Sequence, residues 1–468
     1  MSSLRRCFRL SFVGAAPIAP SLVRAASLFG CLLLLLLVSR PAPAQAPPQE
    51  VAGMTPAAEL KERRRALAAA VGEGLVRIEA RGGEDEPVTR AFFYLTGLET
   101  VGGVLLLQCR EGKAEETLFL PPKSTDWERW NGPRAAPSLT TRQRTGVDAV
   151  LPLADLPAAF EDALEGVSAL WHLPTASPRA GVTSPDDLYR RSLRDKHPQL
   201  ETVKSIGPYL NPLRQIKGAE EIRRLRRAVA ITGQAFQEAF AVGRAGSTEY
   251  ALEAAIESTF RRYGAEAPGF PSIVGSGDRS CILHYKKNAG PIEPGDLIVI
   301  DVGASWGGYT ADITRTIPAS GRYSARQREV YEIVEEAQAA GIAAAKPGAT
   351  FRDIYRAARA VFDEAGVARH LLHGVSHHVG LEVHDVGRTS RPLAPGMVLT
   401  VEPGLYFPNE ELGIRIEDMI LITEEGCEVL SREIPKSADA LEAAMRRAAE
   451  RAPAPATGPP RNPRGVAL

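Results

Sequence analysis

Histidine is concentrated in one short stretch of the chain. Five of the eight histidines lie within residues 370–384: His370, His373, His377, His378 and His384. An imidazole can ligate a metal, transfer a proton near neutral pH, or hydrogen-bond inside a core. The residue types found elsewhere in the sequence indicate which of these three roles applies.

Two pairs of acidic residues interrupt apolar, strand-like sequence. Asp301 lies in "VIDVG" and Asp312 in "YTADITRT", whereas Glu402 lies in "LTVEPG" and Glu417 in "IRIED". A buried carboxylate without a partner is costly, so it requires a counter-charge or a metal. Four such acids, two in each half of the region, favour a shared metal site over separate structural ion pairs.

The charge of these acids suggests two metal ions. Four carboxylates nearly neutralise two divalent cations, and one neutral imidazole can fill a remaining position. Oxygen-rich ligation favours Mn²⁺, Mg²⁺ or Co²⁺ over a cysteine-based zinc site. Two metals about 3.5–4 Å apart can share a water, lower its pKa and hold both ends of a hydrolytic displacement. The pattern predicts a hydrolytic centre.

The acids are carried by a pattern of elements that occurs twice. Residues 218–317 and 325–424 each predict two helices followed by strands. This repetition indicates a duplicated unit that encloses one site between its halves. In the first half, the residues with helical spacing are Ile222, Leu225, Val229, Phe236 and Phe240.

Local signals refine the first half. Ser247 is the predicted N-cap of the second helix, whose core face comprises Leu252, Ile256 and Phe260. The segment "ASWGG" predicts a turn between the strands in "DLIVIDVG" and "YTADITRT".

Residues 47–205 predict a separate α/β domain. "AAELKERRRALAAAV" has helical spacing, and "GLVRIEA", "VGGVLLLQC" and "ETLFLPP" predict strands. Pro208 and Pro212 mark the linker to the second domain, for which we expect residues 206–440. The Pro- and Ala-rich C-terminus predicts a disordered tail, which we place at 441–468.

The N-terminus predicts a secretory signal at residues 1–46. Several arginines precede the apolar run Leu28–Val38, and small residues at positions 42, 44 and 46 offer cleavage sites. Eleven apolar residues are too few to cross a bilayer, which needs about 20. We therefore expect a secreted or periplasmic protein without a stable membrane span after cleavage, and a retained N-terminal anchor is the alternative.

Bulk composition excludes several classes of protein. The 468 residues have a formal net charge of zero and 44% hydrophobic content, so nothing suggests nucleic-acid binding. The five cysteines show no CxxC or zinc spacing, which predicts reduced or buried thiols rather than a disulfide framework.

The motifs together resemble the metallopeptidases of the pita-bread fold, which include aminopeptidase P, prolidase and methionine aminopeptidase. They occur in order as "LHYKKN" (283–288), "IDVG" (300–303), "YTADITRT" (309–316), "HGVSHHVGLEVHDVG" (373–387), "VEPGLY" (401–406) and "IRIED" (414–418). "FFYLTGLET", "TLFLPP" and "ERWNGPR" resemble the creatinase-type N-terminal domain of aminopeptidase P, which methionine aminopeptidases lack. The resemblance implies an α/β (α+β) fold, with a creatinase-like N-terminal domain and a duplicated pita-bread catalytic domain.

The resemblance also implies a set of metal ligands: Asp301, Asp312, His377, Glu402 and Glu417. They would hold two divalent ions, with Mn²⁺ expected and Co²⁺ or Zn²⁺ as alternatives. Asp301 and Asp312 would serve mainly one metal, Asp312 and Glu417 would bridge, and His377 with Glu402 would complete the other. The nucleophile would be a metal-bridging hydroxide, and Glu402 would accept its proton.

The remaining implied roles concern the substrate. His284 and His384 would line the cleft and stabilise the tetrahedral intermediate or its leaving nitrogen. His373 would form the pocket for a proline ring. Tyr406 would support the site or contact the substrate. Arg415 lies two residues before Glu417, which predicts the same strand face and a role in orienting Glu417.

Three positions stay outside the implied machinery. His370 is expected to be solvated at a turn. His378 replaces the bulky aromatic residue of many aminopeptidase P sequences, so it could pack, hydrogen-bond or alter the pocket. Trp127 and Trp130 could form a cleft wall or belong to the N-terminal core.

The expected activity is removal of the N-terminal residue from peptides with proline in second position. A homo-oligomer is expected because the family commonly forms dimers or tetramers. A prolidase that cuts only Xaa-Pro dipeptides and a non-catalytic binding protein of the same fold are the alternatives. The complete set of five candidate ligands disfavours the latter.

Overall fold

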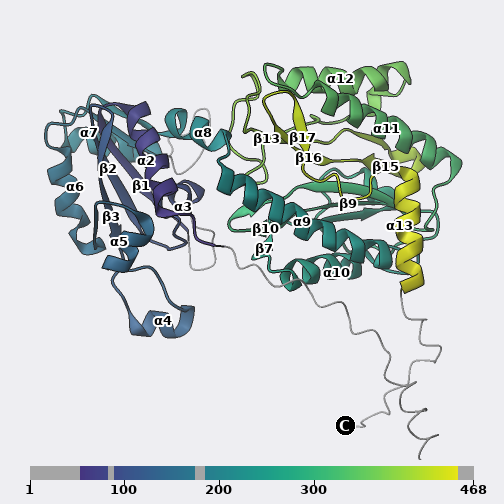
Figure 1. Cartoon of the computed structure of the whole chain (residues 1–468), viewed down its shortest axis with the longest axis horizontal. Helices are drawn as coiled ribbons and strands as arrows, with labels where there is room; N and C mark the ends of the chain where they lie inside the picture. Colours follow the sequence, from purple (N-terminus) through teal and green to yellow (C-terminus); the bar gives the residue numbers. More distant parts are fainter. Residues whose placement is uncertain (1–52, 83–88, 174–184, 452–468) are drawn as a thin grey trace, which may run out of the picture. The chain divides into compact units, whose positions relative to one another are not determined.

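The structure is a computed structural model that describes residues 53–82, 89–173 and 185–451 (Figure 1). The predicted signal at 1–46 and residues 452–468 of the predicted tail lie outside the described residues. Within the described ranges, no helix has both the length and the apolar character needed to span a bilayer. Cys109, Cys281 and Cys427 are free thiols, as expected.

The N-terminal region is built on one six-stranded mixed sheet. Its strand order is β4-β3-β2-β1-β5-β6. Strands β1, β2 and β3 pair antiparallel, while β4 joins β3 and β5 joins β1 in parallel. The bounds are β1 Gly74–Glu79, β2 Val104–Arg110, β3 Lys113–Leu120, β4 Ala149–Pro152, β5 Ala169–His172 and β6 Thr202–Ser205.

Helix α2 (Ala57–Val71) occupies the residues predicted from its spacing and buries Leu60 and Leu67. Its Arg64 lies fully buried and donates to Glu116 on β3 at 2.8 Å, which fixes the helix to the sheet. The other helices of the region are α3 Arg90–Thr96, α4 Thr125–Asn131, α5 Leu139–Thr145, α6 Leu156–Leu164 and α7 Pro185–Lys196, with a 3₁₀ turn η1 at Leu153–Asp155.

The C-terminal region repeats one order of elements, which confirms the predicted duplication. Figure 1 draws α9 with α10 and α11 with α12 on either side of the strands. The first half contains α9 Ala219–Val242, α10 Glu249–Arg262, β7 Ala267–Pro268, β8 Ile273–Ser276, η2 Gly277–Cys281, β9 Leu297–Val302, β10 Ala304–Trp306, β11 Tyr309–Thr310 and β12 Ile313–Pro318.

The second half begins with α11 Ala325–Ala344 and α12 Phe351–Glu364. Its remaining elements are η3 Ala368–His370, β13 Val398–Val401, β14 Gly404–Phe407, η4 Pro408–Glu410, β15 Leu412–Arg415, β16 Asp418–Ile422 and β17 Cys427–Val429. Helix α8 (Gly207–Gln215) precedes both halves and contains the predicted linker prolines.

Two local predictions in the first half need correction. The N-cap of α10 is Thr248, whose side chain accepts from the Ala251 amide, whereas the Ser247 amide closes a turn onto Arg244. The predicted turn "ASWGG" contains strand β10, and only Gly307 and Gly308, both with positive φ, make the turn. Trp306 pairs with Tyr309 across this hairpin.

The predicted tail begins too early. Residues Ala438–Arg451 form helix α13, which buries Leu441 and Met445 fully. Tyr323 and Arg328, near the start of α11, also bind Glu442 on this helix. Ala438, Leu441 and Met445 are all buried on this helix, and their spacing of three and four residues is that of one helical face.

Candidate metal centre and active site

One cavity of about 570 Å³ collects all four predicted carboxylates and His377. Asp301 lies on β9, and Asp312 lies between β11 and β12. Glu402 follows β13, and Glu417 lies between β15 and β16. Each half of the duplicated region therefore supplies two acids from its strands or from the residues directly beside them, while the loop before β13 supplies the imidazole.

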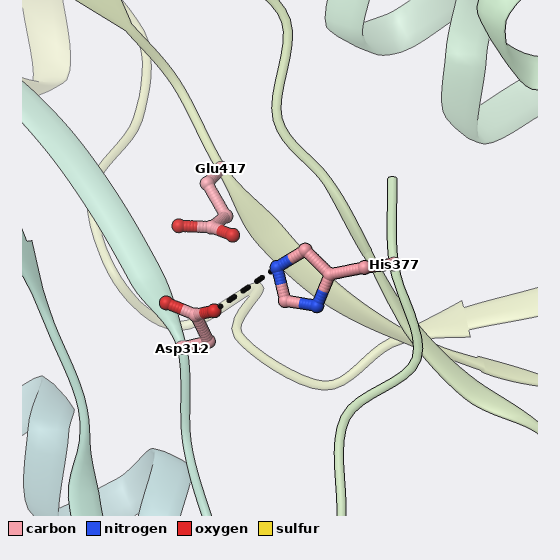
Figure 2. A group of neighbouring side chains, drawn as sticks. All are labelled: Asp312, His377 and Glu417. Carbon is pink, nitrogen blue, oxygen red and sulfur yellow. Dashed lines mark ion pairs between the residues drawn. The ribbon is translucent and has the colours of Figure 1, made fainter. Parts of the chain in front are cut away.

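Asp312, His377 and Glu417 form the tightest part of this group. One potential ligand atom from each lies within 4.8 Å of the others. Figure 2 shows these three side chains pointing toward one another. His377 Nε2 lies 3.3 Å from Asp312 Oδ2. The same nitrogen lies 3.3 Å from Glu402 Oε1. With this spacing, ligand atoms of these residues could bind one metal ion together.

The hydrogen bond on the far side of the His377 ring sets its tautomer. Nδ1 lies 3.1 Å from the backbone carbonyl oxygen of His378. A carbonyl can only accept, so Nδ1 is the donor in the neutral ring, and Nε2 of that tautomer directs its lone pair toward Asp312 and Glu402. A second hydrogen bond of this kind orients most metal-ligating histidines.

The charges of the cluster fit divalent cations. Burial, together with repulsion from Asp301 and Glu402, raises the pKa of Asp312 well above its ordinary value. Burial and the charges of Asp312 and Glu402 do the same to the pKa of Glu417. Asp301 Oδ1 is buried without a hydrogen-bond partner. These carboxylates require positive charge, and their oxygen-rich donor set suits a metal site.

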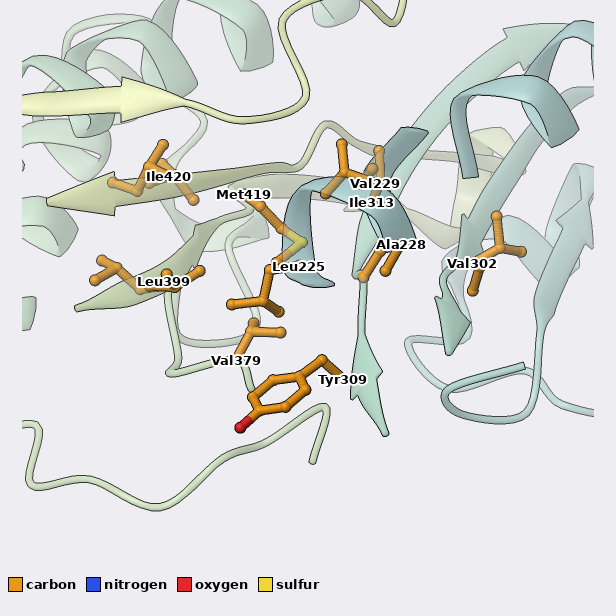
Figure 3. Close-up of a cluster of buried hydrophobic side chains, with 14 of the residues drawn as sticks. Leu225, Ala228, Val229, Val302, Tyr309, Ile313, Val379, Leu399, Met419 and Ile420 are labelled. Carbon is orange, nitrogen blue, oxygen red and sulfur yellow. The ribbon is translucent and has the colours of Figure 1, made fainter. Parts of the chain in front are cut away.

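The cluster rests on an apolar core built from both halves. Figure 3 shows Leu225 and Val229 of α9 and Ile313 of β12 in the same buried cluster as Leu399 and Met419. Met419 Sδ lies 3.3 Å from the Asp312 amide nitrogen, directly beside a ligand position. Close packing at this point limits movement of the acid-bearing strands.

Arg415 contacts a different acid from the one predicted. Its Nη2 donates to Asp301 Oδ2 at 2.6 Å, and no bond to Glu417 is present among the described hydrogen bonds. The reason is that β15 ends at Arg415, so Glu417 does not continue the same strand face. Arg415 lines the cavity and reaches toward Glu417 only through Thr314.

Thr314 is a functional candidate that the sequence reasoning missed. Its Oγ1 donates to Glu417 Oε2 at 2.7 Å and lies 3.3 Å from Arg415 Nε. It is fully buried on β12, two residues after Asp312. The two-residue spacing within "YTADITRT" could have placed it on the Asp312 face of the strand.

His284, His373 and His384 all line the cavity, as predicted. The His384 ring lies 4.3 Å from that of His377 and 6.5 Å from that of His284, measured between centroids. Burial lowers the pKa of His373, and burial together with His377 lowers the pKa of His384. Lowered values favour neutral rings, which can donate and accept hydrogen bonds.

Tyr406 lies behind the cavity rather than in its lining. Its side chain is buried, and its hydroxyl lies 2.8 Å from His373 Nε2 and 3.0 Å from Arg415 Nη1. It therefore supports two cavity residues, which agrees with the supporting role, the first of the two roles expected for it.

The structure also gives the surroundings of His370 and His378, the two histidines without an implied role. His370 was expected to be solvated, but it is half-buried, stacks on Phe407 and bonds the Tyr406 carbonyl through Nδ1 at 3.1 Å. His378 is buried outside the cavity lining, with Nε2 3.0 Å from Gln215 Nε2 and its ring against Phe351. Burial lowers the pKa of His378 to about 4.

A second cavity of about 700 Å³ contains none of the predicted site residues. Trp127 lines it, with Arg134 stacked 4.7 Å from the ring centroid. Trp130 is 85% exposed, which excludes the core role considered for it.

Comparison with known proteins identifies the family. Residues 223–424 match metallopeptidase family M24, and residues 87–171 match the N-terminal domain of aminopeptidase P. The Xaa-Pro aminopeptidase of Escherichia coli (strain K12) is 35% identical over 387 residues, which cover 76% of this chain and 88% of that protein. The chain belongs to the aminopeptidase P group of family M24. Xaa-Pro aminopeptidase 2 of Streptomyces coelicolor is 34% identical, covering 82% of this chain and 90% of its own length.

Solved structures agree with this assignment. Proline aminopeptidase P II from Yersinia pestis has a TM-score of 0.75 at 32% identity, covering 84% of this chain and 100% of its own. Aminopeptidase P from E. coli with the inhibitor Pro-Leu has a TM-score of 0.76 at 32% identity, covering 85% and 100%. The predicted fold class is confirmed, and the protein is a metallopeptidase, a hydrolase of the Xaa-Pro aminopeptidase family.

Proposed function

We propose that this protein removes the N-terminal residue from peptides whose second residue is proline. The observation that carries the proposal is the convergence of four carboxylates and His377 in one cavity that His284, His373 and His384 also line. The named activity of the E. coli relative and its complex with Pro-Leu support the same substrate class.

The five ligands proposed for two divalent ions are Asp301, Asp312, His377, Glu402 and Glu417. Mn²⁺ is the proposed metal, with Co²⁺ or Zn²⁺ as alternatives, and a Zn-substituted form of the E. coli relative has been solved. Two such ions, when bound, would lower the pKa of a shared water and supply hydroxide as the nucleophile. Within the chain, Arg415 holds Asp301 and Thr314 holds Glu417.

Glu402 and the cavity histidines are proposed to accept the proton of the attacking water and to stabilise the charge that develops on the substrate. Glu402 Oε1 lies 3.2 Å from the Thr400 hydroxyl, which orients it beside His377 to accept the proton of the attacking water. His384 and His284 are proposed to donate to the tetrahedral oxygen or the leaving nitrogen. His373, braced by Tyr406, is proposed to contact the proline ring.

The need for a dedicated enzyme follows from the Xaa-Pro bond itself. Proline carries no backbone N–H, so a protease that recognises that group loses a hydrogen bond. A site that accepts the tertiary amide through metal and histidine contacts avoids this loss.

A prolidase activity, restricted to dipeptides, is the second candidate because the same ligands serve both reactions. The match of residues 87–171 to the aminopeptidase P N-terminal domain favours the aminopeptidase. Turnover of an Xaa-Pro dipeptide should be compared with that of an Xaa-Pro-Yaa tripeptide by metal-free protein after Mn²⁺ addition. Cleavage of the tripeptide supports the proposal, and turnover of the dipeptide alone contradicts it.

Absence of both Mn²⁺ binding and Mn²⁺-dependent cleavage would favour a binding protein of the same fold. Secretion or export to the periplasm, and assembly as a homo-oligomer, remain proposals drawn from the N-terminal sequence and the family resemblance. Cell fractionation of the full-length protein tests the first, and light scattering of the purified protein tests the second.

A further inference from the structure

Asp385 is a buried acid beside the histidine loop for which the proposed chemistry has no role. Its side chain is 1% exposed. Oδ1 accepts from Arg214 Nη2 at 2.5 Å, and Oδ2 accepts from Lys217 Nζ at 3.1 Å. Both cationic side chains are buried, at 5% and 0% exposure. Asp385 therefore pairs with two enclosed cations, and Arg214 makes a longer second contact to Glu382 at 3.3 Å. We call Asp385, Arg214 and Lys217 the Asp385 cluster.

The two cations come from the connection between the matched domains. Arg214 lies at the end of α8 and Lys217 lies between α8 and α9. Both fall outside the matched ranges 87–171 and 223–424. The Lys217 amide also donates to the Gly396 carbonyl at 2.8 Å, next to β13. The connecting segment is thus anchored to the catalytic region at two points.

Asp385 in turn fixes the backbone that carries His377. Its amide donates to the His378 carbonyl at 2.9 Å, and the same carbonyl accepts from His377 Nδ1 at 3.1 Å. The route from Asp385 to the proposed metal ligand therefore passes through one carbonyl oxygen.

The loop also packs directly on the ion pair. A Cβ at Gly380 would lie 2.0 Å from Asp385 Oδ2 and 3.0 Å from Lys217 Cε. The Gly380 carbonyl accepts from the Thr310 amide at 3.0 Å, which ties the loop to β11. Only a residue without a side chain allows this approach, so the loop shape depends on the position of the cluster.

We propose that the Asp385 cluster positions His377 and His384 for metal binding and catalysis. Asp385 directly follows His384, whose ring packs against His377, so displacement of Asp385 moves both imidazoles. Asp385 is not among the residues that line the catalytic cavity, so it acts through its neighbours as a positioning residue. The inference rests on the proposed function and adds to it a role for the segment that joins the domains.

The test uses Asp385→Asn and Lys217→Met in the full-length protein. Asparagine keeps the size of the side chain but leaves Lys217 without its counter-charge. Loss of an outer contact to a metal ligand typically costs 10–100-fold in metal affinity or activity. In calorimetric titrations of metal-free protein with Mn²⁺, the dissociation constant of Asp385→Asn should be about 10–100-fold larger than that of the wild type.

Steady-state kinetics on an Xaa-Pro-Yaa peptide at saturating Mn²⁺ gives a second readout. We expect a lower kcat with little change in KM, because displaced His384 affects the transition state more than ground-state binding. Lys217→Met should shift both readouts in the same direction by a smaller factor, since Arg214 still pairs with Asp385. In Asp385→Glu, the Mn²⁺ affinity and kcat should both stay below the wild-type values, because the longer side chain meets Gly380.

Glu116→Gln is the matched control. Glu116 pairs with Arg64 on α2, and both side chains are nearly as enclosed as those of the Asp385 cluster. This variant should unfold at a lower temperature yet bind Mn²⁺ and turn over like the wild type.

Wild-type Mn²⁺ affinity and kcat in folded Asp385→Asn would overturn the inference. If Asp385→Asn does not fold, the same wild-type values in Lys217→Met would overturn it. Failure of the proposed function has a different signature, which is wild-type protein that binds Mn²⁺ but cleaves no Xaa-Pro peptide. In that case, the Mn²⁺ titrations still decide the positioning role.

Discussion

Arg415 Nη2 donates to Asp301 Oδ2 at 2.6 Å and joins a cation of the second half to a carboxylate of the first. The two residues are separated by 114 positions in the chain. This bond holds one oxygen of Asp301 and leaves Oδ1 without a partner inside the cavity. The arginine thereby orients the free oxygen toward the proposed metal position.

Arg415→Lys should retain the positive charge but lose this geometry. A lysine cannot bond Asp301, Tyr406 and Thr314 together, because it lacks the planar fork of the guanidinium. We expect kcat/KM for an Xaa-Pro-Yaa peptide to fall about 10–100-fold. Arg328→Lys, at a half-buried arginine of α11 that binds Glu442 and does not line the cavity, is the control and should show wild-type kinetics. Equal activity in the two variants would contradict the role of Arg415.

Glu402→Gln should abolish peptide cleavage while leaving the fold intact. Glutamine is close in size and keeps an acceptor for the Thr400 hydroxyl, but it cannot take a proton from water. Peptide turnover and far-ultraviolet circular dichroism provide the measurements. Glu410→Gln, at an exposed carboxylate that pairs with Arg326, should remain active. An active Glu402 variant would overturn the general-base role.

Removal of divalent ions should destabilise the protein as well as inactivate it. The proposed ligand carboxylates repel one another without a cation, and a ligand at 100 times its dissociation constant adds about 2.7 kcal/mol to the free energy of unfolding. Thermal unfolding of chelator-treated protein, with and without Mn²⁺, measures this effect.

Asp312→Asn separates metal binding from general stability. This variant removes one of the mutually repelling buried charges, so its metal-free form should be at least as stable as metal-free wild type. Its unfolding temperature should respond little to Mn²⁺. A Mn²⁺ response equal to that of the wild type would argue against Asp312 as a ligand.

Glu249 should make stability depend on pH in the acid range. Although burial raises the pKa of Glu249, hydrogen bonds from Arg279 and from the Ser276 and Gly290 amides hold it below its ordinary value. A lowered folded pKa means that stability is fully present above the unfolded value, about 4.3, and is lost as pH falls through the folded value.

Glu249→Gln should therefore be less stable than wild type at neutral pH, by about 1–3 kcal/mol. The difference should shrink below about pH 4.3 as wild-type Glu249 becomes protonated. Urea unfolding at several pH values checks this expectation. Glu433→Gln, at a side chain that is 91% exposed, should follow the wild-type curve throughout. A difference that persists unchanged in acid would contradict the assignment.

Local pattern in the sequence predicted the elements well. The helical stripe from Leu225 to Phe240 placed α9, and the short apolar runs placed β9 and β12, because both patterns depend only on neighbouring residues. The acids within these strands marked the cavity because a carboxylate in an apolar run must find a partner. The ends of helices were predicted less well, because one hydrogen bond, from the Ala251 amide to the Thr248 hydroxyl, makes Thr248 rather than Ser247 the N-cap.

The sequence by itself determined which residues could form strands, helices and a metal-binding group. Only the tertiary structure decided that Arg415 meets Asp301, that Thr314 meets Glu417, and that Arg214 reaches Asp385 across 171 residues. These partners lie on segments distant in the chain, so their contacts depend on how strands and loops are packed. Periodicity gives the face on which a side chain lies, whereas packing of the whole chain selects the partner it meets there.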